Sequence, residues 1–311
     1  MDNVSEFWYI WVDTGGTFTD CLAQSPTGEI SRVKVLSTGR LRATVSMVLA
    51  QDQLVISCST TLPDNFLVGA NLIASTTGIQ VGEILQQDIR SGKCQLRRAM
   101  DHQLCSGELL ELDFGMEAPV LAARLITQTP PERPLPRAAF HLATTKSTNA
   151  LLERKGDPTA FVVTKGFKDL LKIGDQRRPD LFALNIDQAD PLHDLVFEFD
   201  ERMDAHGDVL KPFDDEAFHQ LSDALLQAGF TTVAIAFLHA VQNSEHERKA
   251  REILQGKGIR HISCSSELAP FVKILPRAET SVVNAYLTPL MERYLDGVES
   301  ALSGGDFRIM T

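Results

Sequence analysis

The sequence has no Cys-x-x-Cys pair and no long apolar run, and its five cysteines are scattered along 311 residues. An odd number of widely spaced cysteines predicts neither a disulfide framework nor a zinc cluster. No apolar run approaches the roughly 18 residues that a bilayer-spanning helix needs. The N-terminus, with Asp2 and Glu6, also lacks the basic and then apolar segments of a secretion signal. These absences predict a cytoplasmic protein without a membrane partner.

Basic residues are in the minority, and one common nucleotide-binding motif is missing. The chain has 30 Lys and Arg against 41 Asp and Glu, a net charge of −11. Nonspecific nucleic-acid binders gain affinity by neutralising phosphates with Lys and Arg, so this balance argues against a nucleic-acid partner. The Walker pattern Gly-x-x-x-x-Gly-Lys-[Ser/Thr] does not occur either. A phosphate ligand must therefore be held by a local arrangement of a different kind.

Residues 13–20, Asp-Thr-Gly-Gly-Thr-Phe-Thr-Asp, provide such an arrangement. They lie between an apolar run, Phe7–Val12, and an alternating segment, Thr17–Ala23, which together predict a strand-turn-strand hairpin. Two adjacent glycines, Gly15 and Gly16, permit positive φ and let an anion approach main-chain N–H groups. An ordinary Gly-Gly hairpin turn is the alternative interpretation.

Side chains of the same segment suit a phosphate and its metal. The hydroxyls of Thr14, Thr17 and Thr19 can add hydrogen-bond donors. Asp13 ends the first strand, where its carboxylate can hold a hydrated Mg²⁺ or orient a water, because Mg²⁺ prefers one or two carboxylates with several retained waters.

The rest of the chain predicts two kinds of structure. A third strand is expected at Ile30–Leu36, and residues 39–136 are short β-like runs punctuated by glycine, typical of a small sandwich or barrel. Helix-strand alternation then predicts an α/β domain. We therefore expect one domain of residues 1–38 and 137–311, interrupted by a β-rich domain of residues 39–136 whose function the sequence does not reveal. The expected strands of the insertion are Leu54–Thr60, Phe66–Thr76, Gln95–Met100, Leu109–Phe114 and Val120–Thr127.

Several elements of the second half have clear signals. Asp214–Gln227 predicts a helix capped by aspartate, Thr231–Leu238 a buried central strand, and Ser244–Glu247 a capping box that begins another helix. Further elements are expected as short helices at Ala150–Lys155 and Phe167–Ile173, strands at Thr159–Thr164 and Arg260–Cys264, and a long helix at Thr280–Leu302.

Many ordered blocks of this sequence resemble the hydantoinase A and 5-oxoprolinase family. Residues 13–20 are similar to the first phosphate loop of the actin, Hsp70 and sugar-kinase superfamily, and their full form looks like that of the family. The later blocks follow in the family's order at residues 144–156, 164–174, 177–181, 200–202, 237–239, 243–247, 265–268 and 284–289. The resemblance covers about residues 7–38 and 140–311, and Pro276-Arg277 beside Val283–Tyr286 favours the 5-oxoprolinase branch. Two departures are the insertion and the missing glycine before Thr144-Thr145.

The resemblance implies a fold and a reaction. The fold is an α/β, ribonuclease H-like core, the half-unit of an actin-like ATPase, with the inserted β-rich domain. The reaction is ATP- and Mg²⁺-dependent opening of a small cyclic amide such as 5-oxoproline or a hydantoin. A second phosphate loop does not follow residue 20. We therefore expect an N-terminal fragment, inactive alone, whose partners are the second ATPase half of the same polypeptide and a hydantoinase B-like subunit or fused domain.

Further polar residues are candidates for the substrate site. Thr144, Thr145, Thr148 and Asn149 form a cluster at a strand-to-helix junction that suits a phosphate or a substrate carboxylate, although Thr148 or Asn149 can equally cap the helix. Arg178 and Asp180 lie in a charged loop that suits a carboxylate or a surface salt bridge.

Three other side chains have competing interpretations. His239 and His246 suit a metal or acid-base pair, but a helix-start role is favoured for His246. Cys264 ends a short apolar strand and is expected to be a buried hydrophobe rather than a nucleophile.

Two other function classes stay open. One is a sugar- or acid-kinase-like phosphotransferase, which would leave a phosphorylated product. The other is a noncatalytic module for subunit assembly. The identity of the cyclic amide and the oligomeric state are not encoded in any motif that we find.

Overall fold

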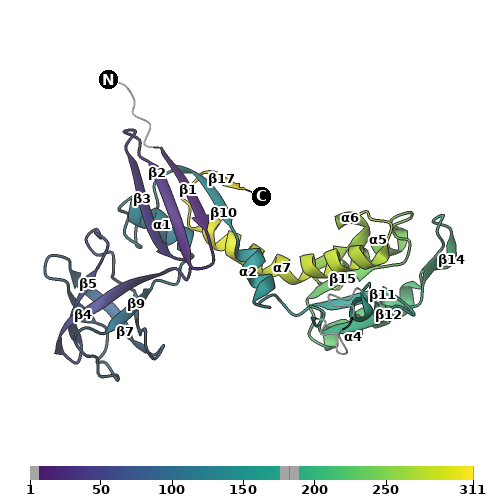
Figure 1. The fold of residues 1–311 in the computed structure, drawn as a ribbon, viewed down its shortest axis with the longest axis horizontal. Coiled ribbons are helices and arrows are strands. Elements are labelled where there is room, and N and C mark those ends of the chain that lie inside the picture. Colours follow the sequence, from purple (N-terminus) through teal and green to yellow (C-terminus); the bar gives the residue numbers. More distant parts are fainter. Residues whose placement is uncertain (1–6, 176–181, 183–188, 311) are drawn as a thin grey trace. The chain divides into compact units, whose positions relative to one another are not determined.

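A computed structural model describes residues 7–175, 182 and 189–310. The chain divides into two compact units, Met1–Lys146 with Arg293–Thr311, and Ser147–Glu292 (Figure 1). Each unit is considered by itself. Within the described ranges, no helix has the length and apolar character required to cross a bilayer.

The first unit contains a five-stranded mixed sheet. Its strands are β1 (Trp8–Thr14), β2 (Phe18–Gln24), β3 (Ile30–Leu36), β10 (Ala138–Thr144) and β17 (Gly305–Ile309), in the order β17-β10-β1-β2-β3. The first three strands pair antiparallel, whereas β10 is parallel to both β1 and β17. The predicted hairpin and third strand are therefore confirmed.

Helix α1 (Ala118–Ile126) packs on β1, β2 and β3 of this sheet. Strand alternation buries Ile10 and Val12 on one face of β1 and leaves Tyr9 and Trp11 exposed on the other. The predicted strand at Val120–Thr127 is wrong, because this segment is helical and Pro119 lies in its first turn. The predicted domain boundaries at residues 39 and 136 stay a prediction.

The segment of the chain between β3 and α1 forms a closed barrel. It consists of β4 (Arg40–Ala50), β5 (Gln53–Cys58), β6 (Asn71–Ala74), β7 (Gln80–Asp88), β8 (Lys93–Leu96) and β9 (Leu109–Asp113), closed in the order β4-β5-β8-β7-β6-β9. Alternate residues of these strands are buried inside it, among them Leu54, Leu72, Ile84, Leu110 and Leu112. Of the two predicted architectures for this segment, the structure has the barrel.

The second unit contains a four-stranded parallel sheet. Its strands are β11 (Ala160–Thr164), β12 (Leu195–Phe199), β15 (Thr232–Ala236) and β16 (His261–Cys264), in the order β12-β11-β15-β16. Every residue of β15 is buried, as its continuous apolar run predicts. The smaller elements are α3 (Leu170–Ile173), the hairpin β13 (Arg202–Met203) and β14 (Val209–Lys211), α4 (Asp215–Gln227), α5 (Glu245–Gly256) and α6 (Ser265–Leu268).

Two helices contain the boundaries between the units, α2 (Lys146–Leu152) and α7 (Ile274–Ser300). Helix α2 begins four residues before the predicted start at Ala150, and α3 covers only the end of the predicted helix at Phe167–Ile173. The predicted aspartate cap of α4 is confirmed, since Asp214 Oδ1 accepts a bond from the amide of Ala217 at 3.0 Å.

The predicted capping box at the start of α5 is wrong. Ser244 occupies the cap position without a side-chain bond, and the Glu247 carboxylate points into the core instead. Its oxygens accept bonds from the Phe237 amide at 2.9 Å and from the Ser265 and Ser266 hydroxyls at 2.6 Å. Glu247 therefore connects α5 to the residues that follow β15 and β16.

Candidate functional site

The glycine loop connects β1 to β2 at the carboxyl end of β1. The amide of Gly15 donates to the Phe18 carbonyl at 3.0 Å, which closes a tight turn. Neither Gly15 nor Gly16 has a positive φ, contrary to the prediction. A Cβ on Gly15 would lie 3.2 Å from the same carbonyl oxygen. A side chain at this position would therefore be tightly packed against the backbone of the turn. Gly16 and Thr17 are exposed at its tip.

Two of the predicted threonine donors lie inside the protein. Thr14 and Thr19 are 5% and 0% exposed, and the Thr19 hydroxyl lies 3.0 Å from that of Ser37. Ser37 donates in turn to the Gly15 carbonyl at 2.8 Å, and its amide donates to the Thr17 carbonyl at 2.9 Å. Ser37 was not identified from the sequence. Ser37 therefore fixes the conformation of the loop through Gly15 and Thr17, and the buried Thr19 contributes to the same arrangement. Of the loop's threonine hydroxyls, that of Thr17 is exposed.

Parallel pairing of β1 with β10 brings Thr144 and Thr145 to the glycine loop. Thr14 and Thr144 are register partners at the ends of the two strands. The Thr145 amide donates to the Thr14 carbonyl at 2.9 Å, and its hydroxyl lies 3.3 Å from the same oxygen. The predicted glycine loop and the predicted Thr144-Thr145 pair, about 130 residues apart in sequence, therefore lie together at the carboxyl ends of β1 and β10.

Lys146 adds a positive charge at the carboxyl ends of these two strands. Its ammonium lies 3.2 Å from Glu117 and 4.3 Å from the centre of the Tyr294 ring, and the two charged side chains are about one-third exposed. The buried Tyr294 hydroxyl donates to Thr14 Oγ1 at 3.3 Å. Burial raises the pKa of Tyr294, while its bonds to Thr14 and Thr144 lower it. Lys146 was not predicted as a site residue, although it belongs to the family-like block 144–156, which could have pointed to it.

Asp13 lies on the other face of the sheet, one residue before Thr14. Its side chain is exposed and has no hydrogen-bond or ion-pair partner in the described part of the chain. The residue directly across the hairpin is Asp20, which pairs with Arg32 at 2.7 Å and Lys34 at 3.1 Å. These two cations hold the pKa of Asp20 below its usual value. Asp13 is therefore the carboxylate of this pair that is free to meet a cation.

A hollow of about 390 Å³ lies on this face of the sheet, lined by both carboxylates and by Trp11, Arg32, His141 and Met310. No group of three metal-ligating side chains occurs among the residues described. Asp13 alone fits a Mg²⁺ that keeps most of its waters and takes its other ligands from phosphate.

The remaining predicted substrate residues lie in the second unit or outside the described residues. Thr148 and Asn149 lie within α2 and belong to the second unit. Neither caps that helix, because it begins at Lys146, whose amide donates to Thr144 Oγ1 at 3.1 Å. Arg178 and Asp180 lie outside the described residues.

His239, His246 and Cys264 are buried or half-buried. His246 is buried with Nδ1 2.6 Å from Glu201 Oε2, so it is not available as an exposed metal ligand or acid-base group. His239 is half-buried with a φ of 61° in the turn after β15. Burial raises the pKa of Cys264 to about 12, which keeps the thiol protonated and confirms the prediction of a buried hydrophobe.

Curated proteins are similar to about half of this chain or more. The chain is 36% identical over 223 residues to 5-oxoprolinase of Saccharomyces cerevisiae, which covers 60% of this chain and 17% of that protein. It is 38% identical over 209 residues to 5-oxoprolinase 1 of Arabidopsis thaliana, covering 58% and 16%. It is 30% identical over 163 residues to caprolactamase subunit alpha of Pseudomonas jessenii, covering 50% and 23%. The chain thus spans less than a quarter of each of these relatives.

Solved structures share the fold at lower identity. Nucleotide-free acetone carboxylase has a TM-score of 0.55 at 17% identity, covering 98% of this chain and 36% of that one. The ATP-dependent caprolactamase from Pseudomonas jessenii has a TM-score of 0.51 at 21% identity, covering 97% and 35%.

The family model described as the hydantoinase/oxoprolinase N-terminal region matches residues 9–122 and 121–258, which is most of the chain. The 5-oxoprolinases among the relatives also support the predicted branch. The chain therefore belongs to the hydantoinase/oxoprolinase family.

Proposed function

We propose that this chain is the N-terminal part of an ATP-dependent enzyme that opens a small cyclic amide, and that residues 13–17 bind the phosphates of ATP. One observation carries the proposal: the glycine loop and Thr144–Lys146 meet at the carboxyl ends of two parallel strands. Exposed loop amides, the Thr17 and Thr145 hydroxyls and the Lys146 ammonium are groups that neutralise phosphoryl oxygens.

The strand arrangement supports a ribonuclease H-like core, the half-unit of an actin-like ATPase. Three antiparallel strands open the sheet, and the later strands β10 and β17 add in parallel beside β1. In open sheets of this kind, ligands bind beyond the carboxyl ends of the parallel strands. The glycine loop occupies that position.

Asp13 would hold Mg²⁺ through a bound water, because it is the unpaired carboxylate beside the loop. ATP supplies the chemistry of activating an amide, whose carbonyl is a poor electrophile until its oxygen is phosphorylated. Within this chain, the loop amides align the phosphates, Lys146 offsets their charge and Asp13 orients the hydrated cation.

Relatives support the substrate class and the partners. The 5-oxoprolinases and the caprolactamase subunit are named for cyclic amides, so we propose 5-oxoproline or a hydantoin for the full protein. A subunit named alpha supports a second, hydantoinase B-like component. The second ATPase half would follow in the same polypeptide. Thr148, Asn149, Arg178 and Asp180 stay proposals for substrate binding.

The test is a coupled assay on the full-length protein, with ADP release and ring-opened product measured for 5-oxoproline and for hydantoin. Asp13→Asn and Gly15→Val are each expected to lower the coupled rate about a hundredfold or more, as loss of one stabilising group commonly does. The exposed barrel residue Asp101 supplies the control variant Asp101→Asn, which should retain the parent rate.

Two results would overturn the proposal in different directions. A stable phosphorylated product without ring opening would establish a kinase-like phosphotransferase. Unchanged coupled activity in both loop variants would assign the chain a noncatalytic role in subunit assembly.

A further inference from the structure

A second hollow lies in the barrel, and its lining residues differ from those of the hollow beside Asp13. The barrel interior is filled, because Leu54, Leu72, Ile84, Leu110 and Leu112 are all fully buried there. A small barrel of this kind has room for a ligand only at an opening in its wall or at its mouth.

Such an opening arises where β5 and β8 separate. The two strands pair only between Gln53–Val55 and Lys93–Gln95, and the Ile56 amide then donates to the Gly92 carbonyl at 2.9 Å. Gly92 has a φ of 69°, and a Cβ on it would lie 2.5 Å from the Ile56 carbonyl oxygen, so this contact requires glycine. Beyond it, the end of β5 and the β7–β8 turn diverge around a hollow of about 420 Å³. That volume lies within the usual range for small-molecule pockets.

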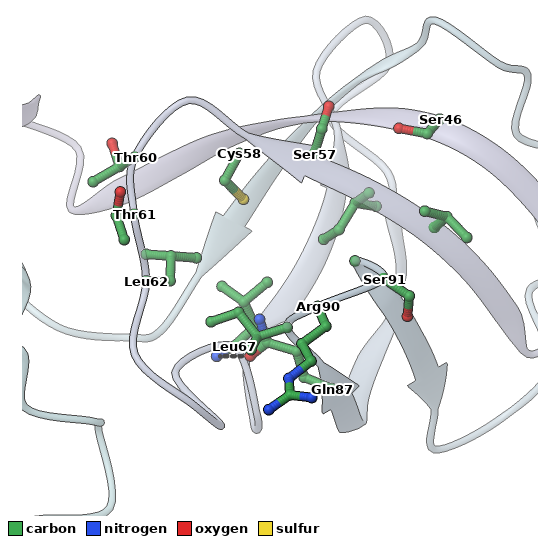
Figure 2. Close-up of a pocket in the computed structure, with 14 residues that line it drawn as sticks. Ser46, Ser57, Cys58, Thr60, Thr61, Leu62, Leu67, Gln87, Arg90 and Ser91 are labelled. Carbon is green, nitrogen blue, oxygen red and sulfur yellow. Dashed lines mark hydrogen bonds between the residues drawn. The ribbon is translucent and has the colours of Figure 1, made fainter.

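The lining combines an apolar floor with polar groups around the rim. Ile56, Leu62 and Leu67 form buried parts of the floor. Figure 2 shows Thr60 and Thr61 on one side of the hollow and Arg90 and Ser91 across from them. Arg90 is its single charged lining residue, and none of the lining residues is acidic.

Two lining side chains have unused hydrogen-bond donors. Gln87 Oε1 accepts from the Leu67 amide at 3.0 Å, which fixes the side chain and leaves its NH₂ group for a ligand. No carboxylate among the described residues lies within ion-pair distance of the Arg90 guanidinium. The nearby Asp88 uses its oxygens within the turn, accepting from the Ser91 hydroxyl at 2.6 Å and the Arg90 amide at 3.1 Å.

We propose that this hollow binds a small monocarboxylic acid with a short apolar chain. The Arg90 guanidinium binds the carboxylate, since its planar fork matches two carboxylate oxygens. Thr60, Thr61 and the Gln87 amide donate further bonds, and the apolar chain lies on Leu62 and Leu67. An amino acid fits less well, because no acidic lining residue is present to receive its ammonium group.

Two residues that line this hollow also line a smaller one that reaches the hairpin of the glycine loop. Cys58 and Thr60 also line a smaller hollow of about 150 Å³ together with Phe18 and Lys34 of the sheet. Phe18 directly follows Thr17 in the loop. An acid bound in the barrel would therefore contact a segment that borders the hairpin of the glycine loop. Its binding does not depend on ATP, so the two proposals can be tested separately.

The experiment is calorimetric titration of this chain with hexanoate in the absence of nucleotide, beside hexan-1-ol as the uncharged probe of the same length. Hexanoate is expected to bind at least about tenfold more tightly than hexan-1-ol, which is the factor expected from one charge-assisted pair. Arg90→Gln should remove that preference. Arg98→Gln, an exposed arginine of the barrel that does not line the hollow, should retain it.

A second variant tests the position without changing charge. Thr61→Trp places a large side chain at the exposed rim and should abolish hexanoate binding. The far-UV circular dichroism spectrum of the folded chain should stay unchanged. Absence of hexanoate binding to the parent chain, equal binding of the two probes, or undiminished binding to either Arg90→Gln or Thr61→Trp would overturn the proposal. Loss of coupled activity in the glycine-loop variants has no bearing on this result.

Discussion

Glu201 Oε2 lies 2.6 Å from Nδ1 of His246, and both side chains are buried in the second unit. The other carboxylate oxygen of Glu201 accepts from the Thr164 hydroxyl at 2.5 Å, and Thr164 accepts from the Leu238 amide at 2.8 Å. One buried carboxylate therefore joins the carboxyl ends of β11 and β15 to the first turn of α5. A buried polar network of this kind stabilises the fold only while every member has its partner.

Replacing Glu201 should therefore be costly. Glu201→Ala leaves the Thr164 hydroxyl and His246 without their shared acceptor, and we expect the free energy of unfolding to fall by about 3 kcal/mol. Chemical denaturation measures this change. Glu252→Ala, at an exposed position of α5, is the control and should change it by no more than about 0.5 kcal/mol. Equal losses in the two variants would show that the buried network has no special role.

A second buried network, around Glu247, could not be predicted from the sequence. Ser244 and Glu247 have the spacing of a capping box, which predicts a local contact. Glu247 instead meets Ser265, Ser266 and the Phe237 amide, and the buried Arg277 donates to Ser265 and to the Phe237 carbonyl. A local motif cannot reveal that its glutamate has partners 10 to 19 residues away in sequence, because those contacts depend on the packing of β15 and β16.

Ser37 offers a test of the glycine loop's support. Ser37→Ala removes the bond to the Gly15 carbonyl and the contact with Thr19, so the loop should become less ordered. If the full-length protein uses ATP as proposed, the KM for ATP should rise several-fold with little change in kcat, since binding geometry rather than a reacting group is affected. Ser31→Ala, on strand β3, which ends one residue before Ser37, should leave both constants unchanged. An unchanged KM in Ser37→Ala would separate this serine from nucleotide binding.

Lys146 should affect catalysis more strongly than stability. Lys146→Met removes the ammonium group. If the full-length protein uses ATP as proposed, kcat/KM for ATP should fall about tenfold to a hundredfold. Lys146→Arg should restore part of this loss because it restores the positive charge. Lys155→Met, at an exposed lysine paired with Glu153, is the matched control. If Lys146→Met alters only the melting temperature, the cation serves the Glu117 pair and not the phosphates.

Local pattern and long-range pairing explain what the sequence could predict here. The hairpin around Gly15 and the central strand β15 were predictable, because alternation and a continuous apolar run are local signals. Helix α1 was not, since eight of its nine residues are buried and no polar face marks a helical period. Likewise, nothing local indicates that Tyr294 meets Thr14, 280 residues earlier in the chain. The two halves of the candidate site were each recognisable, but their meeting depends on the parallel pairing of β1 with β10.

Cys264 gives the second unit a defined sensitivity to alkali. Burial raises the pKa of this thiol from 9.0 to about 12, so between these values the folded chain keeps a proton that the unfolded chain releases. Its contribution to stability is therefore complete below about pH 9 and decreases as the pH rises toward 12, by about 1.4 kcal/mol per pH unit. Cys264→Ala removes this ionisation, so its stability deficit relative to the parent chain should shrink between about pH 9 and about pH 10.5, as measured by urea denaturation with a reductant. Val233→Ala, in the same core, creates a cavity without removing an ionisable group, so its deficit should be constant across that range. A constant deficit in both variants would mean that the Cys264 thiol ionises alike in the folded and unfolded chain.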